Sequence, residues 1–227
     1  MKKFVSLTLG LAAISLATAK ADTIADWTFE TTSPTSAGPL SPEIGSGSAL
    51  GSHAGAATYS SPAGNGSSHS YSVNTWAVND YWEFDFSTVG DTSIKLSYDQ
   101  TSSSTGPGSF GLFYSVNGGA YTQIGANYTV LPNASPNAWN ATTASSLFTF
   151  TPDFSSLGTA LENNTTVSFR IYDMSTVSAN GGTVASGGTD RIDNFIVTAT
   201  SVPEPTTVSL GLMGGLASFF AYRRRNK

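Results

Sequence analysis

The sequence contains no cysteine, which excludes disulfide bonds, a thiol nucleophile and thiolate metal ligands from this 227-residue chain. Charged residues are scarce as well: they make up 11% of the chain, against about a quarter in ordinary globular domains. The only histidines are His53 and His69, which offer little to a zinc site or a Ser-His-acid triad. These absences argue against a thiol enzyme, a zinc enzyme and a typical helical cytosolic enzyme.

Positive charge is nearly absent from the middle of the chain. Between residues 22 and 201 the basic residues are Lys95, Arg170 and Arg191, against fourteen aspartates and glutamates, so this segment has a net charge of −11. A field of that sign repels nucleic acid and anionic lipid headgroups. We therefore expect no nucleic-acid partner, whereas cations and neutral sugars remain acceptable ligands.

The N-terminus has the three parts of a secretion signal. Residues 1–3 are basic at positions 2 and 3, residues 4–19 form an apolar run, and Ala19-Lys20-Ala21 supplies the small-x-small pattern that signal peptidase accepts. The apolar run is short for a membrane span of about 20 residues. We predict a signal peptide over residues 1–21, cleaved after Ala21 or after Ala19; the alternative is an uncleaved N-terminal anchor.

The C-terminus, residues 202–227, also has three parts: a proline pair around a glutamate, an apolar stretch over residues 208–222, and a basic end. The prolines hold the backbone extended. The apolar stretch predicts a short transmembrane helix, and the arginines place its end on the cytoplasmic side. The residues concerned are Val202, Pro203, Glu204 and Pro205 in the first part and Arg223, Arg224 and Arg225 in the last.

This order of parts resembles the PEP-CTERM sorting signal of Gram-negative bacteria, and the resemblance covers residues 202–227. It implies recognition by an exosortase, a transpeptidase-like membrane protease, with cleavage near the Pro-Glu-Pro triplet. It also implies an inner-membrane intermediate, followed by transfer to the cell surface or the extracellular polysaccharide matrix. The alternative is a plain tail anchor.

Between residues 22 and 201, apolar side chains alternate in short segments with turn residues between them. In residues 81–86, for example, Trp82, Phe84 and Phe86 fall on one face of a half-buried strand. No segment has a convincing helical period, and residues 33–66 are typical of a long irregular loop. The pattern predicts an all-β ectodomain over residues 22–201, an antiparallel β-sandwich and most simply a jelly roll. The expected strands are 22–30, 81–86, 93–99, 109–116, 120–124, 146–151, 166–172 and 191–200, with a hairpin turn at Asn117-Gly118-Gly119.

This middle region has a looser resemblance to β-sandwich domains that accompany the same sorting tail in other bacterial surface proteins. The residues that carry it are 27–30 (Trp-Thr-Phe-Glu), 114–119 and 191–195 (Arg-Ile-Asp-Asn-Phe). The broader relatives of such domains, lectin-like jelly rolls, often bind sugars. The resemblance therefore implies carbohydrate binding by analogy of fold.

Hard oxygen donors stand at the two ends of this domain. Glu30 ends the first expected strand, and Asp190, Asp193 and Asn194 open the last. The first and last strands of a jelly roll often lie side by side, and Ca²⁺ takes six to eight oxygen ligands. We predict a structural Ca²⁺ there. The alternative is that Asp190 and Asn194 terminate turns and that Asp193 pairs with Arg191 or Arg170.

Two further patterns bear on function. Glu83 and Asp85 are two apart on one strand face, about 7 Å by strand rise, which a hydrolase could use; such a pair is equally ordinary on an exposed sheet, and we assign no catalytic residue. Exposed aromatics could form a platform for sugar stacking, and otherwise belong to the core. The candidates are Tyr59, Tyr71, Trp76, Tyr81, Tyr121, Tyr128 and Trp139.

The sequence as a whole predicts an exported, non-catalytic cell-surface or matrix protein whose sandwich contacts polysaccharide or other surface proteins. The expected partners are signal peptidase, an exosortase, the inner membrane before sorting, and extracellular polysaccharide. The alternative function is a secreted hydrolase that acts on that polysaccharide.

Overall fold

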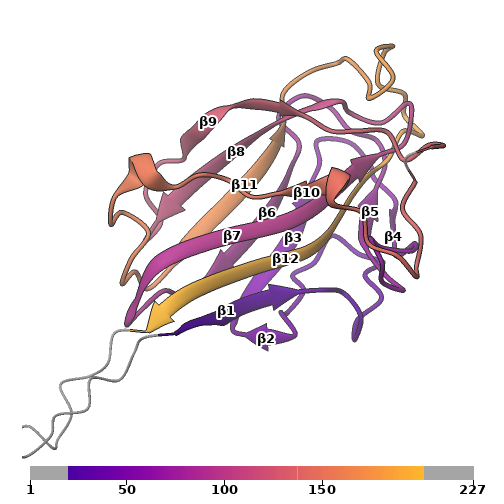
Figure 1. Cartoon of the computed structure of the whole chain (residues 1–227). Coiled ribbons are helices and arrows are strands. Elements are labelled where there is room, and N and C mark those ends of the chain that lie inside the picture. Colours follow the sequence, from indigo (N-terminus) through magenta and orange to yellow (C-terminus); the bar gives the residue numbers. More distant parts are fainter. Residues whose placement is uncertain (1–19, 137, 202–227) are drawn as a thin grey trace, which may run out of the picture. The chain divides into compact units, whose positions relative to one another are not determined.

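Two antiparallel sheets face each other in the computed structural model, which describes residues 20–136 and 138–201 (Figure 1). Sheet A has the strand order β10-β7-β12-β1-β2, with β5 beside β12 and β4 beside β5; sheet B has the order β3-β6-β11-β8-β9. The strands of sheet A are β1 (Ala21–Trp27), β2 (Ile44–Gly45), β4 (Tyr59–Ser60), β5 (Tyr71–Val73), β7 (Asp91–Ser102), β10 (Thr149–Phe150) and β12 (Asp190–Ser201). Those of sheet B are β3 (Gly47–Ser52), β6 (Tyr81–Phe86), β8 (Ser109–Val116), β9 (Thr122–Thr129) and β11 (Val167–Asp173).

The core lies between the two sheets and is rich in aromatic rings. Trp82, Phe84 and Phe86 of β6 are buried, as the alternation in the sequence predicts. Phe84 stacks on Phe195 of β12 with ring centroids 3.7 Å apart, and Trp27 of β1 packs edge-on against both rings. The two edge-on contacts of Trp27 have the geometry that aromatic quadrupoles favour. The predicted all-β, antiparallel sandwich fold is confirmed.

Two short 3-10 helices and four strands, β2 to β5, were not among the expected elements. The expected strand 146–151 is mostly the 3-10 helix η1 (Ser146–Phe148), followed by the two-residue β10; η2 (Ser155–Leu157) comes next. The expected loop 33–66 contains β2, β3 and β4. Strand β3 was missed because its inward positions are small: a Cβ on Gly51 would approach the Trp82 ring to 3.1 Å. Small residues give no apolar alternation, yet they are what the large indole rings require.

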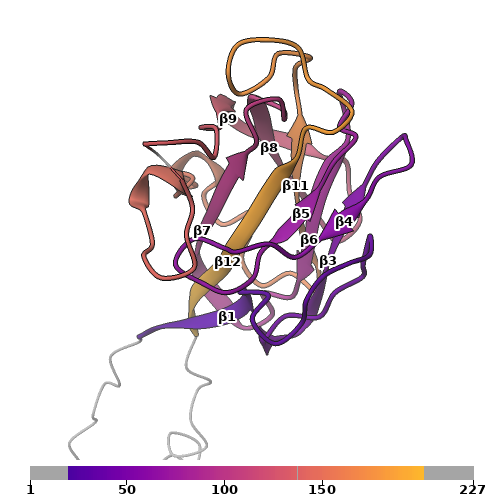
Figure 2. The ribbon, with the colours of Figure 1, turned by 90° about the vertical axis from the view of Figure 1, so that its right-hand side faces the viewer.

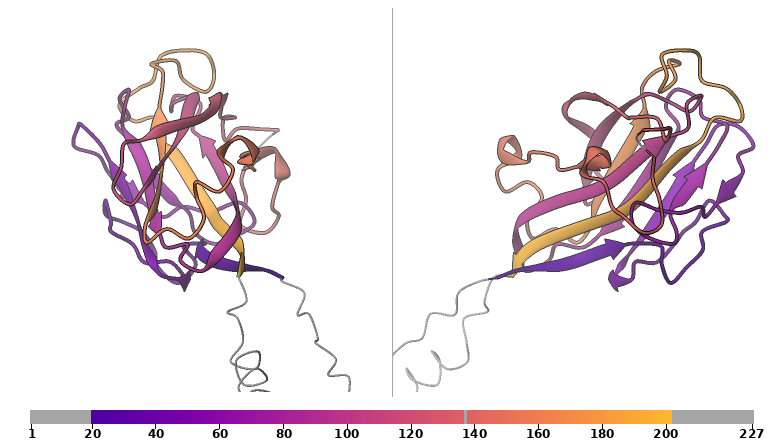
Figure 3. Two further views of the ribbon diagram at one scale, coloured as in Figure 1. Left: turned by 90° about the vertical axis from the view of Figure 1, so that its left-hand side faces the viewer. Right: turned by 45° about the vertical axis from the view of Figure 1, so that its right-hand side comes forward.

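The first and last described strands lie side by side, with Ala21 of β1 paired to Thr200 of β12 (Figures 1 and 3). The chain therefore enters and leaves the sandwich at one end. Both sheets and the whole core fall within residues 20–201, so this segment can fold as one unit. Within the described residues no helix has the length and apolarity to cross a membrane. The predicted tail helix and nearly all of the predicted signal peptide lie outside the described residues.

Candidate functional site

Asp190, one of the predicted calcium ligands, lies fully buried at the start of β12 and points between the sheets. Its carboxylate accepts hydrogen bonds from Trp82 Nε1 at 2.7 Å, Gln100 Nε2 at 3.1 Å and Ser102 Oγ at 2.9 Å. Burial raises the pKa of Asp190 to about 7, and the three donors oppose that rise. Protein donors thus already contact both oxygens of this carboxylate.

Two other predicted ligands hold one loop outside sheet A. Asp193 Oδ2 accepts hydrogen bonds from the Asn65 backbone N–H at 2.9 Å and from Ser67 Oγ at 2.7 Å. Glu30 Oε1 accepts one from the His69 backbone N–H at 2.7 Å. Burial raises the pKa of Asp193 to about 7. The structure therefore brings Glu30 and Asp193 to the same loop, where each contacts different groups.

Asp190 and Asp193 are three residues apart in a regular part of β12, so Asp190 faces the core and Asp193 faces outward. Asn194 follows both: it has a left-handed φ of 48° and lies in a register shift of the β12–β7 pairing, and its side-chain amide donates to Asp99 Oδ2 at 2.8 Å. In the part of the chain that the structure describes, no three His, Asp or Glu side chains gather where a metal ion could be held. The calcium site stays a prediction.

The outer face of sheet B carries a row of side chains that strand register brings together. Leu50, Glu83, Arg170, Phe113 and Gln123 are successive cross-strand neighbours on β3, β6, β11, β8 and β9. Their outward direction follows from the alternation that buries the residues between them. The adjacent row on one side contains Tyr81 and Tyr172, and the row on the other contains Ser48, Asp85, Ser168 and Ser115.

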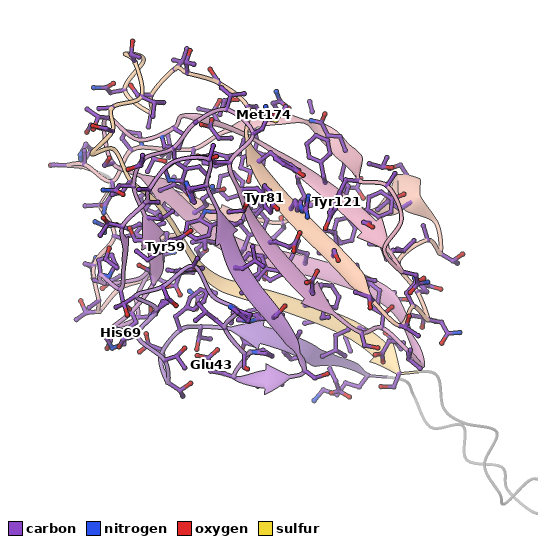
Figure 4. The ribbon with its side chains drawn as sticks, turned by 180° about the vertical axis from the view of Figure 1, so that it is seen from behind. Glu43, Tyr59, His69, Tyr81, Tyr121 and Met174 are labelled. Atoms are coloured by element: carbon purple, nitrogen blue, oxygen red, sulfur yellow. The ribbon has the colours of Figure 1, made fainter. Side chains whose placement is uncertain are left out.

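Arg170 lies between Tyr81 and Tyr121 on this face; Figure 4 labels the two tyrosines. Its guanidinium carbon lies 4.2 Å from the ring centroid of Tyr81 and 4.0 Å from that of Tyr121, two cation–π contacts. Its Nε pairs with Glu83 Oε2, which also accepts the Tyr121 hydroxyl at 2.9 Å, and its Nη1 donates to Tyr172 Oη at 2.9 Å. Four neighbours thus fix a side chain that is still 24% exposed. We call Arg170 and these four neighbours (Tyr81, Glu83, Tyr121 and Tyr172) the Arg170 cluster.

The surface continues on both sides of the Arg170 cluster. The ring of Phe113 packs edge-on against Tyr172 with centroids 5.1 Å apart, which adds a half-buried aromatic. Next to Glu83, Asp85 lines a shallow hollow of about 330 Å³, and burial raises the pKa of its carboxyl. The hollow is lined mainly by hydroxyls and backbone, from residues 46–48, 85–87, 165 and 166. This face therefore combines aromatic rings, charged groups and hydroxyls.

Sequence reasoning found part of this face. Of the seven candidate platform aromatics, Tyr81 and Tyr121 lie on it. Arg170, Tyr172 and Phe113 were missed as members, although their outward positions on alternating strands were a usable signal. The remaining candidates are placed elsewhere: Tyr71, Trp76 and Trp139 are buried, and Tyr59 and Tyr128 pack against the core.

Two groups that a hydrolase could use are already engaged or lie elsewhere. Glu83 Oε2 contacts both Arg170 and Tyr121, so this oxygen is already occupied by protein partners. His53 is buried elsewhere, with its ring 4.5 Å from Trp76. The chemistry that the face supports is recognition by hydrogen bonds and ring contacts.

Comparisons with known proteins add the following. Residues 201–225 match the PEP-CTERM protein-sorting motif. No curated protein matches the chain. Among similar solved structures is the K2 cleaved adhesin domain of Lys-gingipain, a protein of Porphyromonas gingivalis W83, with 13% identity, coverage of 80% of this chain and 98% of that chain, and a TM-score of 0.43.

Two carbohydrate-binding modules are also similar. TmCBM27, solved in a study of specific mannan recognition, has 13% identity, covers 81% of this chain and 100% of its own, and gives a TM-score of 0.40. TmCBM61 in complex with β-1,4-galactotriose has 15% identity, coverages of 75% and 92%, and a TM-score of 0.36. Likeness at this level does not identify a ligand for this chain. The motif match confirms the predicted sorting signal: the chain is a protein with a C-terminal PEP-CTERM protein-sorting motif, preceded by an antiparallel β-sandwich.

Proposed function

We propose that this chain is an exported surface or matrix protein whose sandwich binds polysaccharide through the outer face of sheet B, without catalysing a reaction. The sorting motif marks the chain for export and exosortase processing. In the proposed route, signal peptidase removes the N-terminal segment, the tail holds an inner-membrane intermediate, and exosortase then transfers the ectodomain to the surface.

The observation that carries the binding proposal is the Arg170 cluster. Its guanidinium is held by Tyr81 and Tyr121 through its π-faces, by Glu83 through an ion pair and by Tyr172 through a hydrogen bond. Side chains fixed in this way lose little conformational entropy when a ligand binds, which favours affinity. Aromatic edges beside hydroxyl and amide groups can contact both the apolar faces and the hydroxyls of a sugar.

A structural role for the Arg170 cluster is the competing explanation, because a paired arginine between two rings also stabilises a sheet. A binding measurement distinguishes the structural role from the binding role. We expect the segment 20–201 to bind matrix polysaccharide, and Tyr81→Ala with Tyr121→Ala to lower its affinity at least tenfold. Leu147→Ala, at a side chain that is 57% exposed elsewhere, is the matched control and should bind normally.

The measurement is titration calorimetry against polysaccharide from the producing cell, with melting curves to confirm that each variant is folded. If the double variant is folded and binds as well as the wild type, the outer face of sheet B is not the binding surface. A parallel assay for new reducing ends should detect none. Release of reducing ends that Glu83→Gln abolishes would favour the hydrolase alternative instead.

A further inference from the structure

A second concavity, a groove of about 610 Å³, lies on the other side of the sandwich. Its floor is formed by outward side chains of β7 and β12, where Lys95 pairs with Thr198 and Ser97 pairs with Ile196. Its wall is the segment that follows β10 and contains η2, residues 151–162, which passes beside β7 (Figures 1 and 2). The volume is within the range of about 300–1,000 Å³ that is usual for ligand sites.

The wall of this groove is anchored, so the concavity is preformed. Phe154 stacks on Phe169 of the core with ring centroids 5.5 Å apart, and the Leu161 carbonyl accepts the Thr88 hydroxyl at 2.7 Å. Glu162 Oε1 accepts the Ser93 backbone N–H at 2.8 Å, which joins the wall to the first residues of β7. The groove therefore has its shape before a ligand binds.

Five polar side chains of the groove are free to bind a ligand. Within residues 20–136 and 138–201, the side chains of five lining residues make no hydrogen bond or ion pair with another residue, and they project from successive outward positions of β7 and from its neighbours. Phe154 and Ile196 add apolar surface between them. The five are Ser93, Lys95, Ser97, Thr151 and Thr198.

The charges around the groove select against an anionic ligand. Lys95 is exposed, and two carboxylates, Asp153 and Glu162, line the same groove. The surrounding domain has a net charge of −11 by the count of residues 22–201, and such a field repels anions. An uncharged ligand rich in hydroxyl groups fits a lining of hydroxyls, one ammonium donor, carboxylate acceptors and a half-buried ring.

We propose that this groove is a second binding site, for a segment of an uncharged polysaccharide, and that the domain is therefore bivalent. The proposal rests on the proposed function for its ligand class. Because the groove and the Arg170 cluster lie on the outer faces of different sheets, two polysaccharide chains can be held on opposite sides of one sandwich. A protein of this kind bridges chains of the matrix, and tethered sites raise avidity without new contacts.

The test measures how many equivalents of an oligosaccharide one chain binds. The probes are uncharged β-glucan, mannan and galactan oligosaccharides, with oligogalacturonate as the charged comparison, titrated into segment 20–201. We expect two equivalents of one uncharged probe per wild-type chain, and one equivalent after the groove substitutions Lys95→Ala with Ser97→Trp. Lys20→Ala replaces another exposed lysine and should leave two. Tyr81→Ala with Tyr121→Ala should also leave one, from the groove.

Bridging gives an independent readout, because bivalent protein should aggregate long polysaccharide in light scattering and either one-site variant should not. One equivalent for the wild type, unchanged by the groove substitutions, overturns the second site and leaves the proposed function standing. Loss of all binding on changing the groove alone supports the groove and overturns the sheet B proposal. Tighter binding of oligogalacturonate, or no binding of any probe, overturns the proposal of an uncharged ligand.

Discussion

Replacing Asp190 tests how much the buried hydrogen bonds to its carboxylate contribute to stability. The Asp190 carboxylate accepts three hydrogen bonds, and in Asp190→Ala the Trp82 and Gln100 donors lose their partner while buried. Ser102 is spared, because its hydroxyl is also 2.6 Å from the Pro107 carbonyl. An unsatisfied buried donor costs about 1–3 kcal/mol, so two predict a loss of about 2–6 kcal/mol in the free energy of unfolding.

The pH dependence of the unfolding free energy is a more specific test than the size of that loss. Burial raises the pKa of Asp190 to about 7 in the folded state, from an ordinary value of 3.8. The folded state thus binds a proton more tightly than the unfolded chain, and stability falls as pH rises from about 4 to about 7. Each pH unit in this window costs at most about 1.4 kcal/mol, so Asp190 alone removes up to about 4 kcal/mol by neutral pH.

Asp190→Asn isolates this effect. The amide keeps an oxygen for the Trp82 and Gln100 donors and cannot ionise, so its stability should exceed that of the alanine variant and fall less steeply than the wild type between pH 4 and 7. Asp193 adds a similar slope, because burial raises its pKa to about 7 as well, and this slope remains in the variant. Urea unfolding at several pH values measures the difference, with Asp22→Asn at an exposed position as the control. Equal slopes for Asp190→Asn and the wild type would refute the reasoning.

The remaining predictions concern sorting, calcium and the Arg170 cluster. Alanine at residues 203–205 should leave the protein in the inner membrane at full mass; normal surface delivery and an unchanged mature mass would contradict exosortase recognition of the triplet. Millimolar Ca²⁺ should raise the melting temperature by several degrees if the predicted site exists, since a hundredfold excess over Kd stabilises by about 2.7 kcal/mol; Asp193→Ala should abolish this response and Asp91→Ala should keep it, whereas equal melting in Ca²⁺ and chelator would rule the site out. Tyr121→Phe keeps the ring over Arg170 and removes the hydrogen bond to Glu83, so it should cost about 0.5–1.5 kcal/mol in unfolding free energy, and a loss as large as that of Tyr121→Ala would show that the ring contact contributes nothing.

Local pattern was enough to predict the sandwich. The alternation in residues 81–86 survives in the structure because Trp82, Phe84 and Phe86 are large enough to require burial on one face. The same reasoning failed at β3, where small residues meet large rings from other strands, since no property of residues 47–52 alone announces that contact. It also failed at residues 146–148, where alternation over a short apolar segment does not distinguish a strand from a 3-10 turn.

The calcium prediction shows what the periodicity of a single strand cannot predict. Asp190 and Asp193 are three residues apart, so a regular strand would place them on opposite faces, and the bulge at Asn194 lies beyond both. Proximity in sequence was read as proximity of carboxylates, whereas the two side chains bind donors on different sides of sheet A. Glu30 and Asp193, which are 163 positions apart by their numbers in the sequence, are the pair that reaches one loop.

The Arg170 cluster depends on register rather than on pattern, which is why only Tyr81 and Tyr121 were predicted as parts of a binding surface. Tyr81 and Tyr121 come from opposite sides of β11, and no local sequence shows that Arg170 lies between them. One signal was nevertheless present: the segment 22–201 has only three basic residues, and one of them occupies an outward position of a central strand. A scarce charge in such a place needs a partner, and outward Glu83 on the neighbouring strand supplies it. Pairing the cation of a central strand with the outward acid of its neighbour would therefore have given the β6–β11 register, although the rule does not extend to Lys95, which makes no ion pair among the described residues.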